Sequence, residues 1–171
     1  MGKGYIHIYT GNGKGKTTAA FGLAIRAALS GKKVYIGQFI KDMKYNETKI
    51  TTLLPQIKIE QLGYGCFITG PPVEKDILKA EEALVHCASI LKSGYYDLVI
   101  LDEIVVSIYL KLLNEDAVIK AVKEKSPNVE VVLTGRYASD NLIEIADLVT
   151  EMKEIKHYYN EGILSRDGID C

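Results

Sequence analysis

A glycine- and lysine-rich segment most constrains how this sequence can fold. It reads TGNGKGKTT over residues 10–18 and lies between two runs of different character. Residues 5–9 are aromatic or β-branched and predict a strand. Residues 16–30 carry Ala, Leu and Ile at helical spacing and predict a helix that ends at Gly31. A strand, a glycine-rich loop and a helix in succession form the setting in which proteins bind phosphate groups.

The residue types in this loop suit a polyphosphate. Glycines let the backbone curl so that successive N–H groups face phosphate oxygens, and the helix N-terminus adds partial positive charge. Lys16 is placed to reach the outer phosphates, and the Thr17 hydroxyl to bind Mg²⁺. The common pattern has Gly where Thr10 stands, and here Gly11 and Gly13 supply the flexibility. A glycine-rich turn without a ligand is the alternative, which two lysines in one turn disfavour.

The rest of the chain alternates between strand-like and helix-like segments. This alternation predicts one domain over residues 1–171, an α/β fold with a mostly parallel central sheet and helices on both faces. With the phosphate loop, it indicates the three-layer α/β/α arrangement of RecA-like P-loop NTPases. Further strands are predicted over 33–39, 57–62, 97–101, 129–133 and 148–152, and further helices over 48–54, 73–92, 104–113, 116–125 and 140–146, with loops over 42–46 and 64–72.

A second half of a nucleotide site follows the apolar run at residues 97–101. Asp102 and Glu103 come where this strand ends, and the carboxyl ends of parallel strands meet at the ligand-binding edge of such a sheet. One of the two carboxylates would orient or bind Mg²⁺, directly or through water. An acidic pair that caps the following helix is the alternative.

Composition excludes several classes of function. The 21 Lys and Arg residues against 22 Asp and Glu give a net charge of −1, which argues against a nucleic-acid or membrane-surface binder. No apolar run is long enough to span a membrane, and residues 1–5 lack the apolar stretch of a signal peptide, so a cytoplasmic protein is expected. Cys66, Cys87 and Cys171 are spread without metal-ligand spacing, and Cys87 is expected to pack in the core. His7, His86 and His157 are expected to be structural.

Several motifs resemble the P-loop type of ATP:corrinoid adenosyltransferase. They are TGNGKGKTTAAFGLAIRAA with GKKVYIGQFIK, DLVILDE at 97–103, VVLTGR at 131–136, IADLVTEMKEIKH at 145–157 and GID at 168–170. The resemblance implies transfer of the 5′-deoxyadenosyl group of ATP to cobalt(I) of a reduced corrinoid, either cobalamin or cob(I)yrinic acid a,c-diamide, with release of triphosphate. It further implies Mg²⁺, a flavodoxin- or flavin-type reductant and a homodimer. Cobalt(I) carries no proton, so the reaction needs positioning and charge stabilisation rather than a general base.

The resemblance also implies roles for individual residues. Lys16, Thr17 and Glu103 would be catalytic, with Thr17 and Glu103 as Mg²⁺ ligands and Asp102 behind them. Arg26 would lie near the nucleoside and Arg136 near the site, although a surface pair between Arg136 and Asp140 is the alternative. The loop residues that would hold the triphosphate are Gly11, Asn12, Gly13, Lys14, Gly15, Lys16, Thr17 and Thr18.

The corrinoid side departs from the family pattern. The family has a Gly-Phe-Thr-Trp segment against the corrin, and here Phe67 remains while Thr69 stands where Trp is usual. Phe67 and Ile68 are therefore the expected corrinoid-binding residues, with packing in the core as the alternative. The chain also begins almost at the first strand, without the N-terminal extension of some members. Two other functions stay open: an ordinary P-loop NTPase or phosphotransferase, and a nucleotide-binding module without the acceptor reaction.

Overall fold

The computed structural model describes residues 2–40, 46–63 and 72–170. Within these residues six strands pair in parallel to form one sheet, in the order β3-β2-β4-β5-β1-β6. Every neighbouring pair is parallel because helical or irregular crossovers join successive strands. The strands are β1 (Ile6–Thr10), β2 (Val34–Gln38), β3 (Ile57–Gln61), β4 (Leu98–Asp102), β5 (Glu130–Thr134) and β6 (Leu148–Glu151).

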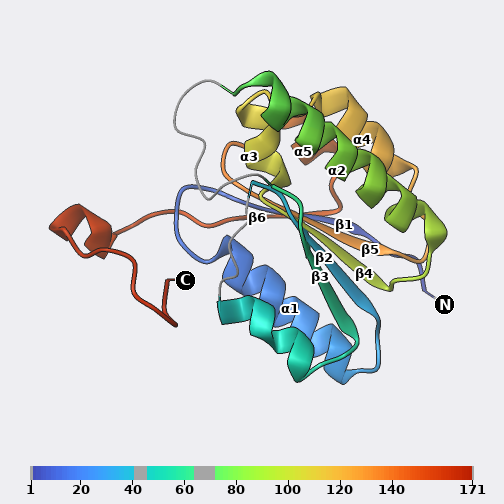
Figure 1. The fold of residues 1–171 in the computed structure, drawn as a ribbon, viewed down its shortest axis with the longest axis horizontal. Helices are drawn as coiled ribbons and strands as arrows, with labels where there is room; N and C mark the ends of the chain where they lie inside the picture. Colours follow the sequence, from blue (N-terminus) through green and yellow to red (C-terminus); the bar gives the residue numbers. More distant parts are fainter. Residues whose placement is uncertain (1, 41–45, 64–71, 171) are drawn as a thin grey trace.

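Helices cover both faces of this sheet (Figure 1). One face carries α1 (Lys16–Leu29) and the 3₁₀ helix η1 (Asn46–Thr52). The other carries α2 (Glu74–Ser93), α3 (Ile104–Tyr109), α4 (Glu115–Lys123) and α5 (Asp140–Ile145). The expected three-layer α/β/α fold is therefore confirmed.

Strand β4 shows why its sequence is an uninterrupted apolar run. Val99 and Leu101 pack in the core beneath α2 to α5, whereas Leu98 and Ile100 pack in the core beneath α1. None of the four is more than 2% exposed, since alternate side chains enter opposite buried layers. Cys87 lies in the first of these cores as expected, and burial raises the pKa of its thiol to about 12.

Two predicted helices differ in extent or type. The helix expected over 104–113 ends at Tyr109, because Lys111 takes a left-handed conformation with φ 62° and Leu112 N–H bonds back to the Ser107 carbonyl at 2.9 Å. The helix expected over 48–54 is the 3₁₀ helix η1, which begins at Asn46 within the predicted loop. Of the predicted loops over 42–46 and 64–72, residues 42–45 and 64–71 lie outside the described residues.

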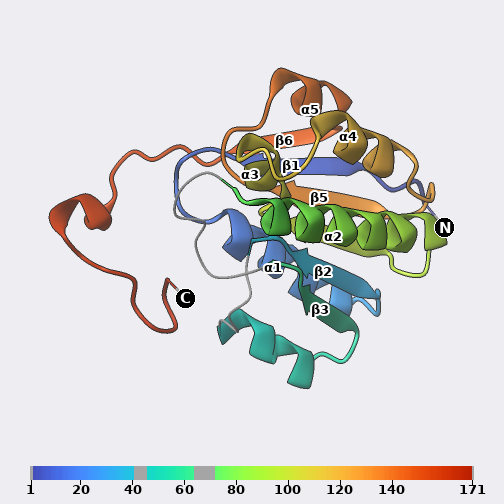
Figure 2. The ribbon, with the colours of Figure 1, turned by 45° about the horizontal axis from the view of Figure 1, so that its top comes forward.

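The segment after β6 leaves the sheet at its carboxyl edge and turns back toward the start of α1 (Figures 1 and 2). It contains the short 3₁₀ helix η2 (Tyr158–Glu161). Among the described residues, no helix is both long and apolar enough to cross a membrane.

Candidate nucleotide site

The loop between β1 and α1 depends on two glycines with positive φ. Gly11 has φ 95° and Gly15 has φ 121°, conformations that other residues rarely adopt. Gly15 sets the start of α1, where no side chain among the described residues caps the helix and the first turn has no acidic residue. The start of α1 thus lacks a side-chain cap and an acidic first turn, which suits the binding of an anion there.

The loop also packs tightly against the residue that follows β6. The Gly13 N–H donates to the Met152 carbonyl at 2.6 Å, and the Met152 N–H donates to the Thr10 carbonyl at 2.8 Å. A Cβ atom on Gly11 or Gly13 would lie 2.5 or 2.7 Å from the Met152 oxygen. These glycines therefore permit close approach of two chain segments, and the Gly13 N–H is already used within the protein.

Lys16 is buried at the centre of the loop, with 7% of its surface exposed. Its Nζ donates to the carbonyl oxygens of Gly11 and Gly13, both at 2.8 Å. Burial and the nearby positive charge of Arg136 lower the pKa of Lys16, while Glu103 and Asp102 act in the opposite direction. An anion beside Lys16 and Arg136 would relieve their mutual repulsion.

Asp102 joins the loop to the neighbouring strand ends through a fully buried carboxylate. Its Oδ1 accepts from the hydroxyls of Thr17 at 2.9 Å and Thr134 at 2.7 Å, and its Oδ2 accepts from Gln38 Nε2 at 3.3 Å. Gln38 and Asp102 are register partners on β2 and β4. The predicted meeting of the phosphate loop with the carboxyl end of β4 is thus present.

Glu103 directly follows β4 and has a left-handed conformation, with φ 63°. Its N–H donates to the Thr134 hydroxyl at 2.9 Å, and its carboxylate is close enough to Lys16 to raise that pKa. Glu103 occupies the N-cap position of α3, but its side chain makes no capping hydrogen bond. The geometry favours a carboxylate held at the site over the alternative of a helix-capping pair.

The other predicted site residues divide into three groups. Asn12, Lys14 and Thr18 are exposed on or beside the loop, and Arg136 follows β5 at the same edge of the sheet. Arg26 lies in the last turn of α1, about 15 Å of helix rise from the loop, so the structure does not bring it to this cluster. Phe67 and Ile68 lie outside the described residues.

Sequence reasoning missed several residues of this region. Gln38 and Thr134 each end a buried strand, and a polar residue in that position is the signal that could have found them. Met152 carries no comparable signal.

The three histidines lie in different surroundings. His7 Nε2 lies 2.6 Å from a carboxylate oxygen of Glu130, and His86 Nε2 lies 2.7 Å from one of Glu60. His157 lines a cavity next to the loop and caps η2.

The donor set fits a hard divalent cation. The Thr17 hydroxyl and the carboxylates of Asp102 and Glu103 supply oxygen, the ligand that Mg²⁺ prefers. In the described parts of the chain, three or more His, Cys, Asp or Glu side chains do not gather into a metal cluster. Such a site would therefore have to draw further ligands from phosphate or water.

The fold is that of an α/β protein with a parallel sheet and a glycine-rich loop between its first strand and first helix, a setting typical of phosphate binding. Residues 2–171 match the family described as ATP:corrinoid adenosyltransferase BtuR/CobO/CobP, and the chain belongs to this family. It is 34% identical to a corrinoid adenosyltransferase of Escherichia coli (strain K12) over 168 residues, covering 98% of this chain and 86% of that one. It is 35% identical to a corrinoid adenosyltransferase of Sinorhizobium sp over 172 residues, with 98% and 80% covered. Corrinoid adenosyltransferase CobA of Salmonella typhimurium (strain LT2) is 32% identical over 168 residues, with 98% and 86% covered. The chain is accordingly a transferase that adenosylates corrinoids.

Proposed function

We propose that this enzyme transfers the 5′-deoxyadenosyl group of ATP to cobalt(I) of a reduced corrinoid and releases triphosphate. One observation carries the proposal: in a chain that matches this family over residues 2–171, buried Lys16 lies in a phosphate loop that Thr17 ties to Asp102. Cobalt(I) would attack C5′ of the ribose, the C5′–O bond would break, and both electrons of that bond would leave with triphosphate.

The residues of the loop suit this leaving group. Lys16 would exchange the carbonyls of Gly11 and Gly13 for phosphate oxygens, which offer stronger, charge-assisted hydrogen bonds. Lys14 and Arg136 would add positive charge at the same edge of the sheet, with Asn12 and Thr18 as polar contacts. Charge that develops on the triphosphate is thereby stabilised by groups that are already in place.

Thr17 and Glu103 would hold Mg²⁺, and Asp102 would orient Thr17 from behind through the hydrogen bond at 2.9 Å. When bound, the cation would neutralise part of the negative charge of the polyphosphate. Phe67 and Ile68 remain the proposed contacts to the corrinoid. A flavodoxin- or flavin-type reductant, a homodimer and a cytoplasmic location complete the proposal.

The test is an anaerobic reaction of the protein with MgATP and chemically reduced cob(I)alamin, in which the polyphosphate product is identified. We expect triphosphate to form one-for-one with a light-sensitive corrinoid that contains a Co–C bond. Lys16→Ala should lower the rate by about 100-fold or more, because it removes a central charge from the phosphate site. Lys120→Ala is the matched control, since it removes an exposed cation of α4, which covers the opposite face of the sheet from α1.

Two other products would give different answers. ADP and phosphate without an alkylated corrinoid would contradict the proposal and favour an NTPase. Binding of ATP without either product would favour a nucleotide-binding module and turn attention to Thr69, for which Thr69→Trp is the next variant.

A further inference from the structure

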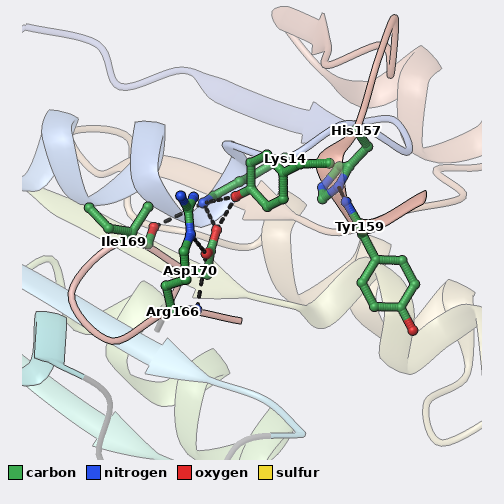
Figure 3. Close-up of polar contacts among 7 residues, drawn as sticks. Lys14, His157, Tyr159, Arg166, Ile169 and Asp170 are labelled. Atoms are coloured by element: carbon green, nitrogen blue, oxygen red, sulfur yellow. Dashed lines mark hydrogen bonds and ion pairs between the residues drawn. The ribbon is translucent and has the colours of Figure 1, made fainter. Parts of the chain in front are cut away.

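The segment after β6 returns to the phosphate loop and holds Lys14, as Figure 3 shows. The Lys14 ammonium donates to the Tyr158 hydroxyl and to the Ile169 carbonyl, both at 2.9 Å, and pairs with the Asp170 carboxylate. A lysine of the nucleotide site is thus bound to a carboxylate of the same chain 156 residues away.

Several donors converge on the Asp170 carboxylate. Besides Lys14, they are the Tyr158 hydroxyl, Arg166 Nε at 2.9 Å and the Arg166 N–H at 3.1 Å. The Arg166 guanidinium lies over the Tyr158 ring, 4.5 Å from its centroid, which fixes the two side chains together. Only 11% of the Asp170 side chain is exposed, and bonds from Lys14, Tyr158 and Arg166 hold its pKa well below the usual range.

These contacts are those of an anion-binding site. A carboxylate and a phosphate present the same kind of oxygen acceptor, and Arg and Lys bind both. Lys14 links the phosphate loop to the residues that hold Asp170, because its backbone is part of the loop and its side chain reaches Asp170. We call Lys14, Tyr158 and Arg166 the clasp.

A cavity of about 260 Å³ lies between the loop and residues 153–158. Lys14, Lys153, Lys156 and His157 line it, against the single carboxylate of Glu154. The space next to the clasp is therefore open to a ligand and has an excess of cationic side chains. A polyphosphate that extends beyond the loop past Lys14 would enter favourable surroundings.

We propose that the clasp is an anion subsite that continues the phosphate loop, that Asp170 fills it when the loop is empty, and that the outer end of a polyphosphate replaces Asp170. This inference rests on the proposed function, which places a triphosphate on the loop. Triphosphate carries several negative charges and contacts loop and clasp together, so it competes effectively with one carboxylate. Its binding releases residues 166–170 from Lys14.

Calorimetric binding of inorganic tripolyphosphate to the full chain tests this subsite. Asp170→Asn removes the competing charge, and we expect its affinity to rise about threefold to tenfold. Arg166→Gln removes a cation of the clasp and should weaken binding by a similar factor. Asp167→Asn is the matched control, because this carboxylate lies on the same segment but accepts a hydrogen bond from Asn46, at 2.5 Å. The affinity of Asp167→Asn for tripolyphosphate should stay within about twofold of wild type.

Pyrophosphate tests where along the polyphosphate the clasp acts. Arg166→Gln should lower the affinity for tripolyphosphate more than the affinity for pyrophosphate, since the shorter anion need not reach past Lys14. An equal loss of affinity for both anions would overturn the placement of the clasp at the outer end of the polyphosphate. An equal gain in Asp170→Asn and Asp167→Asn, or no gain in the former, would overturn the role of Asp170.

The outcomes separate this inference from the proposed function. If neither Asp170→Asn nor Arg166→Gln changes the affinity for tripolyphosphate, the subsite is overturned and adenosyl transfer still stands. The expected pattern of affinities without adenosyl transfer to cobalt would support the subsite and contradict the proposed function.

Discussion

At the scale of single residues, Asp102 is the buried carboxylate that holds the site together through its hydrogen bonds. Its buried carboxylate accepts hydrogen bonds from Thr17, Thr134 and Gln38. Asp102→Asn would turn one acceptor into an N–H₂ group that faces these donors, leaving buried polar groups unpaired. We expect a loss of about 2–4 kcal/mol in the free energy of unfolding, measured with urea.

Glu81→Gln serves as the control for that variant. Glu81 is exposed on α2, and removal of its charge should change the free energy of unfolding by about 0.5 kcal/mol or less. A loss in Asp102→Asn no larger than in Glu81→Gln would show that the hydrogen bonds of Asp102 contribute little to folding.

The sequence identified one side of this network and missed the other. Asp102 and Thr17 could be predicted because a carboxylate after an apolar strand and a hydroxyl in a phosphate loop have known uses. Gln38 and Thr134 could not be linked to them, since contact depends on which strands are neighbours. The strand order that places β4 between β2 and β5 comes from packing of the whole sheet.

At the scale of elements, close packing of the phosphate loop on Met152 yields a prediction. Gly11→Ala adds a Cβ 2.5 Å from the Met152 oxygen at a residue with φ 95°, so the two segments must separate. We expect binding of ATP to weaken by about tenfold or more and stability to fall by about 1–3 kcal/mol. Calorimetry with ATP and thermal unfolding measure the two effects.

Gly22→Ala provides the matched substitution for that test. Gly22 lies within α1, and a Cβ there would have nothing within 4 Å. The free energy of unfolding should rise by about 0.5–1 kcal/mol because alanine favours helix, with ATP affinity unchanged. Equal effects of both substitutions would contradict the close-approach argument.

Glu60 connects β3 to both β2 and α2 and makes this connection sensitive to acid. Burial raises the pKa of Glu60, but hydrogen bonds from Lys58, Tyr35 and His86 outweigh burial and bring the pKa down to about 2. Because the pKa is lower in the folded state, its stabilisation is complete above the unfolded value and is lost as pH falls from about 5 to 2. Glu60→Gln should flatten the stability curve by about 1–2 kcal/mol in this window. Unfolding at pH 7, 4 and 2.5 measures it, and parallel curves would refute the contribution.

Elements were predictable where their signal is local. The period of α2 and the apolar run of β4 fix those segments, whereas α3 stops at Tyr109 without Gly or Pro, through a left-handed Lys111. The path of residues 153–170 had no local signal either. It depends on Lys14 and Asp170, which are far apart in the sequence.

At the scale of the whole molecule, the carboxyl edge of the sheet collects groups from the full length of the chain. The loop after β1, Asp102 at the end of β4 and Arg136 after β5 lie there, and Asp170 joins them through its ion pair with Lys14 of the loop. A polyphosphate held by the loop and Arg136 would bind to the folded chain alone, because unfolding separates these cationic groups. Ligand binding and global stability are therefore coupled.

Thermal unfolding with MgATP measures this coupling. ATP at about 100 times its Kd should add about 2.7 kcal/mol to the free energy of unfolding, which raises Tm by about 5–10 °C for a chain of this size. Removal of Mg²⁺ with EDTA should reduce the rise in Tm, because Thr17 and Glu103 would then lack the proposed cation between them and phosphate. Lys16→Ala should abolish most of the rise in Tm, whereas Lys120→Ala, which removes an exposed cation of α4, should keep it. An equal rise in Tm for wild type and Lys16→Ala would mean that ATP binds away from the phosphate loop, because Lys16 is the cation at the centre of that loop.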